Sequence, residues 1–387
     1  MSIDMSSSNK RRLARDRAKP TIKGEGGNVE NKETTLASGA AAVPKAAWIV
    51  GGVLAVAGIV AFAVQMANQT MAGASQYPWG FYIAMFYAAA SAGAGVLVVG
   101  GIGAWAGIIE ARQVSKLYAV ACALFVIASI LIVVDLGNPA GIFLTYTSAN
   151  VASPVFFDAI VLPLCIVFTI VAALVVARGD AATKVVAAIG IVAGLVLMGV
   201  EAWLLTTCSG KDAWGVLLGA GPALIQAVTL AAAVVVCFAP ASRGWKMLLA
   251  GASIVMVAAL AFDVVLNGGS DTVLGQQFSA IGAQPLFWIA VVVAVVACVL
   301  ALVAKTDLLA RVAAICAIVS VPLFKLAIFW GTQSIVAIAQ LEAAGAFPFD
   351  VMEVIVFAGA LGIGVLVYNV ATLILAKRSL PIKEVQA

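Results

Sequence analysis

The sequence predicts an all-α polytopic membrane protein with about ten transmembrane helices. Hydrophobic residues make up 64% of the chain and charged residues 10%, whereas soluble globular proteins are about half apolar and about a quarter charged. The apolar residues also lie in runs of roughly 18 or more, the length at which a helix can span a bilayer. These observations exclude a soluble globule and predict one integral membrane domain over residues 44–380.

Ten apolar runs are bounded by charged or turn-forming residues. The first follows Lys45, the second follows Trp79-Gly80, and the third ends at Asp135–Pro139 (DLGNP). A proline opens the fourth and eighth runs, and a basic residue lies at the start of the fifth, seventh and ninth. The predicted spans are about 46–67, 81–109, 117–136, 155–177, 185–207, 214–238, 245–266, 285–304, 308–330 and 352–376.

The Lys and Arg residues predict the topology. With the N-terminus in the cytoplasm, 20 of the 22 lie in the tails and inner loops, Lys211 lies in an outer loop, and Lys325 lies within a span. Because positive residues favour the cytoplasmic side, both termini are expected to be cytoplasmic, with the chain embedded among the lipids of a bacterial cytoplasmic membrane. The net charge of +4 therefore reflects topology and predicts no nucleic-acid partner.

Residues 1–43 are polar and basic, and they predict a disordered cytoplasmic tail anchored to the inner leaflet. A twin-arginine export signal at Arg11-Arg12 is the alternative. It is disfavoured because about thirty polar residues separate this pair from the first apolar run.

Histidine is absent, and the six cysteines form no CxxC pair. Membrane b-type haems use axial imidazoles, and iron–sulfur clusters and structural zinc use grouped cysteines. Ser and Cys nucleophiles are commonly activated by histidine. The sequence therefore predicts no haem, no iron–sulfur cluster and no metal site in this chain.

Four features recur in the same order in the two halves of the chain. The matching pairs are Trp79-Gly80 with Trp214-Gly215, Asp135 with Asp263, Pro154 with Pro285, and Lys184–Ile189 with Arg311–Ile315. An even number of spans separates the copies, so they run parallel, unlike the inverted repeats of many transporters. We predict two four-helix bundles, at about 80–207 and 214–345, with the first and tenth spans as peripheral helices.

Each outward-running span of the two predicted bundles carries one ionisable residue. At a rise of about 1.5 Å per residue, these four residues lie roughly 21 to 29 Å from the nearest inner cation, in the outer third of the membrane. Ionisable residues within hydrocarbon mark functional sites by default. The four are Asp135, Glu201, Asp263 and Lys325, and Asp158 and Glu353 lie at the same depth. Two alternatives stay open: Asp135, Asp158 and Glu353 reach interfacial water, or Lys325 pairs with Glu201 or Asp263.

Aromatic side chains accompany these charges. Trp and Tyr are common at membrane interfaces, but aromatic rings beside carboxylates also suit an amphipathic quinone. Its ring packs on aromatics while its oxygens take hydrogen bonds and protons. The aromatics at this depth are Tyr77, Trp79, Tyr82, Tyr87, Tyr146 and Trp203. The sequence predicts a quinone headgroup near Asp135.

Three segments carry a resemblance to a known family. Trp79–Ala84 (WGFYIA), the small-residue run Ala88–Gly95 and Asp135–Pro139 resemble the NrfD/PsrC family of polysulfide-reductase-like membrane subunits. The resemblance is strongest over residues 77–160 and extends to about residue 345. Ten spans match the longer members, including those of alternative complex III. Asn138 stands where a common family version has Arg, so any role of that cation is not carried over.

The resemblance implies a haem-free anchor subunit of a respiratory iron–sulfur/molybdopterin-type oxidoreductase. Such a chain has no complete active site alone. It exchanges electrons between an exchangeable menaquinone or ubiquinone and an iron–sulfur subunit on the outer face, next to a molybdopterin-type catalytic subunit. The implied catalytic residues are Asp135 and Asp158, which also bind quinone with Tyr82 and Asn138, and the candidates for proton transfer are Glu201, Asp263 and Lys325. Two alternatives are a secondary transporter of the drug/metabolite type and a purely structural anchor.

Overall fold

The computed structural model describes residues 43–68, 79–179, 182–239, 241–334 and 351–378. Within these ranges the regular structure is helical, no strand occurs, and ten helices are long and apolar enough to cross a membrane. The prediction of an all-α polytopic membrane protein is therefore confirmed. Residues 1–42 of the predicted tail, the aromatic Tyr77, and the end of the second predicted bundle beyond residue 334 lie outside the described residues.

The ten spans follow the predicted runs closely. Their bounds are α2 (Lys45–Asn68), α3 (Phe81–Gly95) continued by the π-helical η2 (Val96–Gly100) and α4 (Gly101–Trp105), α5 (Ala111–Asp135), α7 (Pro154–Val176), α8 (Thr183–Thr206), α10 (Ala220–Phe238), α11 (Arg243–Asn267), α13 (Pro285–Val303), α14 (Asp307–Gln333) and α15 (Val351–Arg378). Short helices connect some of them: η3 (Pro139–Gly141), α6 (Ile142–Thr147), α9 (Asp212–Leu218) and α12 (Val273–Gly282).

The start of the sixth span differs from the prediction. Trp214 lies in the separate helix α9, and the span α10 begins only at Ala220. The break falls at Gly219, whose backbone is extended and packs so tightly on Gly215 that a Cβ would collide with the Gly215 carbonyl. Trp214 therefore lies in a connection at the helix ends, where it packs against residues of other spans.

Two groups of four spans make contacts in the same order. In the first group α3 contacts α5, α5 contacts α7, α7 contacts α8, and α8 returns to α4. In the second group α10 contacts α11, α11 contacts α13, α13 contacts α14, and α14 returns to α10. These contacts support the two-bundle arrangement, which stays our proposal. The groups meet where α10 and α14 pack on α3, and residues 81–101 of the α3–α4 span are all buried.

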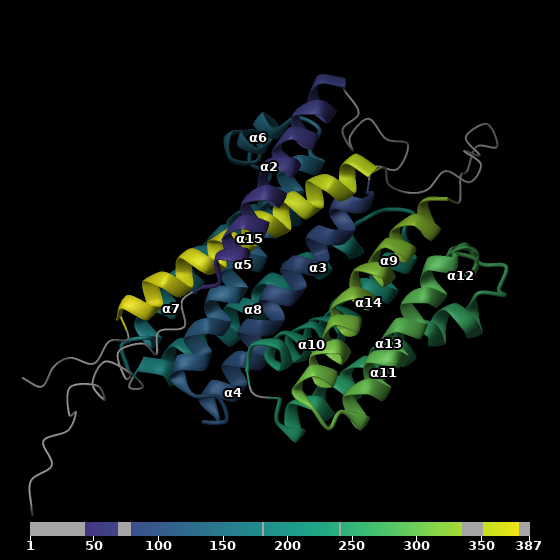
Figure 1. Cartoon of the computed structure of the whole chain (residues 1–387). Helices are drawn as coiled ribbons and strands as arrows, with labels where there is room; N and C mark the ends of the chain where they lie inside the picture. The colour runs from purple at the N-terminus through teal and green to yellow at the C-terminus, as the bar shows by residue number, and fades with distance from the viewer. Residues whose placement is uncertain (1–42, 69–78, 180–181, 240, 335–350, 379–387) are drawn as a thin grey trace, which may run out of the picture. The chain divides into compact units, whose positions relative to one another are not determined.

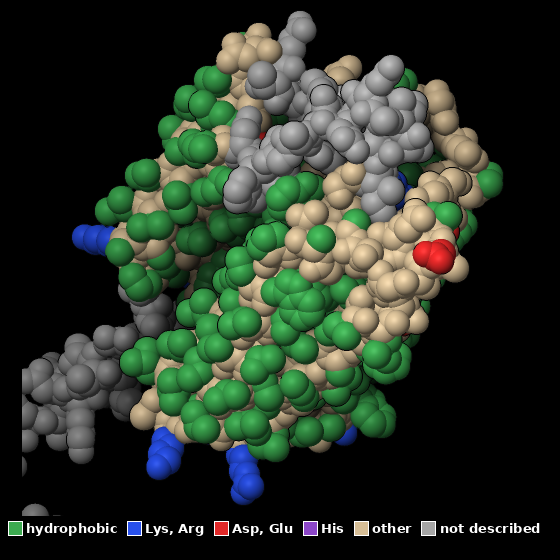
Figure 2. Space-filling model, turned by 90° about the vertical axis from the view of Figure 1, so that its right-hand side faces the viewer, with side chains coloured by type: hydrophobic (Ala, Val, Ile, Leu, Met, Phe, Trp, Pro, Cys, Tyr) green, Lys and Arg blue, Asp and Glu red, His purple; other side chains and the backbone are tan. Residues whose placement is uncertain are grey.

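The first and last spans form a pair of their own. Helices α2 and α15 run side by side, and α15 also packs on α5 (Figure 1). Only 22% of an 18-residue apolar stretch of α2 is buried, so most of this helix faces outward. Figure 2 shows another face of the domain, covered mainly by hydrophobic side chains with Lys and Arg at its lower edge. Such a face is typical of a surface in contact with lipid.

The α2–α15 contact depends on two glycines. A Cβ added to Gly58 would collide with the backbone of Gly359, and one added to Gly359 would collide with Gly58. We expect Gly58→Leu to force the helices apart and to lower the free energy of unfolding by about 1 to 3 kcal/mol. Thermal unfolding of the intact chain in detergent measures the loss. Gly52→Leu is the control, because a Cβ at Gly52 meets nothing within 4 Å; equal effects of both variants would contradict the prediction.

Candidate quinone site

The site is built around the turn that ends α5. The helix stops at Asp135, and Gly137 takes a φ of 68°, a left-handed conformation that favours glycine. The Asn138 side chain accepts a hydrogen bond from the Ala140 backbone N–H at 3.2 Å, and Pro139 opens η3. The motif Asp135–Pro139 is therefore a chain reversal that leaves the Asp135 side chain at the end of a transmembrane helix.

The Asp135 side chain faces a cavity of about 290 Å³. The cavity lies among α3, α5, α6, α7 and α8, and Asp158 near the start of α7 lines the same space. Its wall is otherwise mainly aromatic and aliphatic. The lining residues are Trp79, Ile83, Phe86, Tyr87, Ser129, Ile132, Val133, Asp135, Leu136, Ile142, Thr145, Tyr146, Val155, Asp158, Ala159, Leu162, Pro163 and Leu204.

Both aspartates have unused hydrogen-bonding capacity. The Oδ1 atoms of Asp135 and Asp158 are buried and have no hydrogen-bond partner among the described residues. Buried polar atoms usually have such a partner, because leaving one unpaired costs free energy. Two acceptor oxygens in an apolar, aromatic cavity fit a flat ligand with hydroxyl groups on its ring. A hydroquinone headgroup has this chemistry, so the residues present fit a quinone.

Aromatic rings pack around Trp79, which lines this cavity. The Trp79 ring stacks on Trp214 of α9, with centroids 4.8 Å apart and planes 17° from parallel. Phe329 of α14 contacts both rings edge-on, at 5.8 Å from Trp79 and 4.9 Å from Trp214. Trp214 and Phe329 do not line the cavity themselves, but they pack against Trp79, which does.

Gln333, at the end of α14, fixes the backbone of Trp79. Its Oε1 accepts a hydrogen bond from the Trp79 N–H at 3.2 Å, and its Nε2 donates to the Trp79 carbonyl at 2.8 Å. We expect Gln333→Leu to leave both Trp79 groups unpaired, at a cost of about 1 to 3 kcal/mol in stability, and to raise the KM for quinol more than it lowers kcat.

Steady-state quinol oxidation and thermal unfolding test this expectation together. Gln276→Leu is the control, because Gln276 is an exposed glutamine on α12 at the same end of the spans. If Gln333→Leu leaves both the KM and the unfolding temperature unchanged, Gln333 does not position Trp79.

A second set of charges lies behind the cavity. Glu201 of α8 and Lys325 of α14 are buried, and the charge of Glu201 interacts with those of both Asp158 and Lys325. The Lys325 Nζ lies 5.7 Å from the centroid of the Tyr87 ring, which lines the cavity. Glu201 belongs to the first group of spans and Lys325 to the second, so the two charges come from different groups. The sequence leaves two candidate partners for Lys325, Glu201 and Asp263, and its pairing with Glu201 stays our proposal.

Other predicted site residues lie elsewhere. The Tyr82 hydroxyl is buried and donates to Gln65 Oε1 of α2 at 2.7 Å. Asn138 is exposed in its turn. Asp263 is half-buried near the end of α11 and accepts a hydrogen bond from Asn267 Nδ2 at 3.0 Å. None of these three is among the residues that line the cavity.

Lys211, the one cation predicted in an outer loop, binds a helix end. Its Nζ donates to the Thr332 carbonyl at 2.9 Å, in the last turn of α14. A cation is favourable there because the helix dipole is negative at the C-terminus. Partial burial lowers the pKa of the Lys211 amine, and burial raises the pKa of the nearby Cys208 thiol. Within the described ranges, no group of His, Cys, Asp and Glu side chains could hold a metal ion.

The fold and the cavity define a class: a polytopic helical membrane protein with a buried, carboxylate-lined pocket near one end of its spans. Residues 69–220 match the family described as polysulphide reductase, NrfD. The NrfD/PsrC resemblance is therefore confirmed over this segment, which contains every residue that lines the cavity. The match indicates a membrane-anchor subunit of a respiratory oxidoreductase. A search of curated proteins finds no match to the chain.

Proposed function

We propose that this chain is the haem-free, quinone-reactive anchor subunit of an iron–sulfur/molybdopterin-type oxidoreductase. The observation that carries the proposal is the pair of unpartnered carboxylate oxygens, on Asp135 and Asp158, that face one aromatic cavity. Quinol oxidation releases protons as well as electrons, so a site for it needs proton acceptors beside the ring. The NrfD match supports the same class of subunit.

Asp135 has the primary role in this mechanism. Its carboxylate accepts the hydrogen bond of a ring hydroxyl and takes the proton as electrons leave for the partner subunit. Bound quinol supplies the two-electron, two-proton chemistry. Trp79, Phe86 and Tyr87 pack against the ring and exclude water, which strengthens the hydrogen bond to the carboxylate.

Asp158 accepts the second proton in our proposal. Glu201 and Lys325 then extend the path, because the charge of Glu201 interacts with that of Asp158 and with that of Lys325. Protons move between groups within hydrogen-bond reach or through a water, so internal water molecules are needed between these side chains. Asp263 stays a separate candidate for proton transfer in the second group of spans.

The partners in this proposal are an iron–sulfur subunit and, beyond it, a molybdopterin-type catalytic subunit. The iron–sulfur subunit docks at the end of the spans where the cavity lies, because electrons must leave from there. Purification of the intact chain from its native membrane in mild detergent tests this assignment. Co-purification of iron–sulfur and molybdopterin subunits, with bound menaquinone or ubiquinone, would support it. A homo-oligomer that lacks quinone would favour the transporter alternative.

A further inference from the structure

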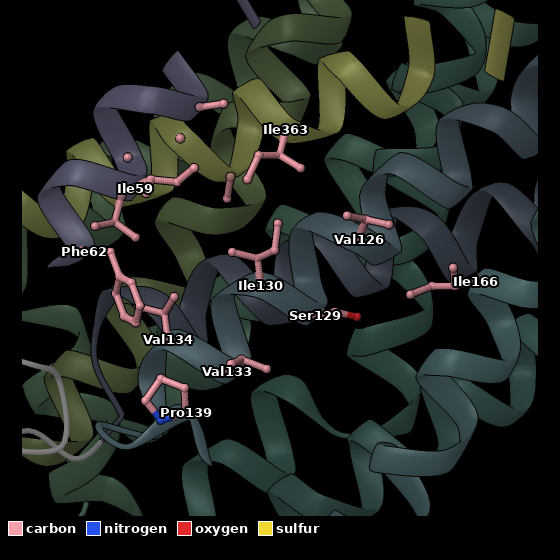
Figure 3. A pocket seen from close by; sticks show the side chains of 15 residues that line it. Ile59, Phe62, Val126, Ser129, Ile130, Val133, Val134, Pro139, Ile166 and Ile363 are labelled. Atoms are coloured by element: carbon pink, nitrogen blue, oxygen red, sulfur yellow. The ribbon is translucent and has the colours of Figure 1, made fainter. Parts of the chain in front are cut away.

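A second and larger cavity begins directly beside the carboxylate cavity. It has a volume of about 550 Å³ and lies among α2, α5, α7 and α15 (Figure 3). Ser129 and Val133 of α5 line both cavities. The two cavities therefore adjoin at these two residues of α5.

The motif that ends α5 divides its residues between the two cavities. Asp135 and Leu136 line the carboxylate cavity, whereas Val134 and Pro139 line the second one. Figure 3 shows Pro139 at one end of the second cavity, near Val134 and Phe62. The same turn thus presents a carboxylate on one side and hydrocarbon on the other.

The second cavity has an apolar lining. Ser129 is its one hydroxyl-bearing residue, and the Ser129 Oγ already donates to the Phe125 carbonyl at 2.9 Å. The other lining residues are aliphatic or aromatic, apart from two glycines. A charged or hydrogen-bonding headgroup would find no side-chain hydrogen-bond partner on this lining. A hydrocarbon chain has no hydrogen bonds to lose, so its burial there costs no such interaction.

A third cavity continues the second one along α15. Its volume is about 370 Å³, it lies among α5, α7 and α15, and Ile363 lines both spaces. Its one hydroxyl, on Thr169, is bound to the carbonyls of Cys165 and Ile166. The two cavities together, which we call the apolar groove, lead from the carboxylate site toward the opposite end of the spans.

We propose that the apolar groove holds the isoprenoid tail of the quinone whose headgroup occupies the carboxylate cavity. This inference rests on the proposed function. The groove adjoins the headgroup cavity at Ser129 and Val133 of α5, so a tail attached to a ring in that cavity reaches the groove directly. A phospholipid keeps its headgroup at the membrane surface instead, and an acyl chain in the groove would be unrelated to the carboxylates.

Binding of quinones with and without a tail to the intact chain tests the proposal. The probes are a naphthoquinone pair and a benzoquinone pair, each with one tailed and one tailless member. Ile363→Trp fills the junction of the two apolar cavities, and Leu361→Trp is the control, because Leu361 is exposed on the same helix and does not line the groove. We expect Ile363→Trp to weaken binding of the tailed member by about tenfold or more and to leave the tailless member unaffected.

Several outcomes would overturn the tail assignment. One is that Ile363→Trp leaves the affinity for the tailed and the tailless quinone unchanged, which would assign the groove to lipid. Another is that Ile363→Trp lowers the affinity for both quinones equally. Val126→Phe, on the α5 side of the groove, replaces Ile363→Trp if that variant does not fold. A photoreactive group at the tail end should then label α5, α7 or α15 along the groove, and labelling confined to other helices overturns the proposal. If the unaltered chain binds none of these quinones, the proposed function itself fails.

Discussion

Replacing Asp135 with asparagine is expected to reduce quinol-dependent electron transfer by about 10²- to 10⁴-fold, the range attributed to one general acid–base group. Asparagine has nearly the same shape as aspartate and keeps one carbonyl acceptor. It cannot take a proton, so the ring hydroxyl loses its base while the cavity keeps its volume. The Asp135 Oδ1 has no hydrogen-bond partner among the described residues, so the substitution breaks no such contact that would confound the result.

The measurement compares two activities of the same purified complex. Quinol oxidation reports the membrane site, and oxidation of an artificial donor reports the partner subunits alone. Asp135→Asn should lower the first and leave the second intact. Asp271→Asn is the matched control, because Asp271 is an exposed aspartate between α11 and α12. Quinol oxidation that is unchanged in Asp135→Asn would remove Asp135 from the mechanism.

Local sequence was sufficient to predict where most of the spans begin and end, because the apolar runs set the helix ends. The common depth of the carboxylates, calculated from the rise per residue, stays a prediction. The motif Asp135–Pro139 predicted the end of α5 and the position of Asp135 because a glycine turn and a proline act on their immediate neighbours. Asp158 joined the same cavity for a similar reason, since it follows the proline that opens α7.

Rotation of a helix about its axis was not predictable. Tyr82 and Tyr87 are five residues apart, which places them about 140° apart around an α-helix. Tyr87 faces the cavity, whereas Tyr82 faces Gln65 of α2. Helix α3 is apolar on every face and buried throughout, so its sequence contains no polar stripe to indicate which tyrosine turns inward.

Contacts between distant segments were not predictable from the sequence either. Gln333 and Trp79 are 254 residues apart, and no local pattern marks a glutamine at the end of α14 as a partner of the α3 backbone. The internal repeat misleads in one respect. Asp263 matches Asp135 in position along its span, yet it bonds to Asn267 and does not line the carboxylate cavity. Similar spacing therefore predicts similar depth, but not a similar environment.

Removing the Lys325 amine is expected to be the most destabilising of the changes considered. Lys325 and Glu201 are 1% and 3% exposed, and removing one partner of a buried charge pair typically costs about 3 to 5 kcal/mol because the other charge is left uncompensated. Lys325→Met should therefore unfold at a lower temperature. The double variant Glu201→Gln/Lys325→Met should recover much of the loss, because it buries no unpaired charge.

A double-mutant cycle separates this pair from the alternative partner of Lys325. Thermal unfolding of each variant is followed with a thiol-reactive fluorophore, which reports exposure of the buried cysteines Cys122, Cys165 and Cys298. The cycle of Glu201 and Lys325 should give a coupling energy well above measurement error, whereas that of Asp263 and Lys325 should give almost none, since Asp263 is bonded to Asn267. A larger coupling with Asp263 would mean that Glu201 is not the counter-charge of Lys325, and the proposed proton path from Asp158 would lose its connection to the second group of spans.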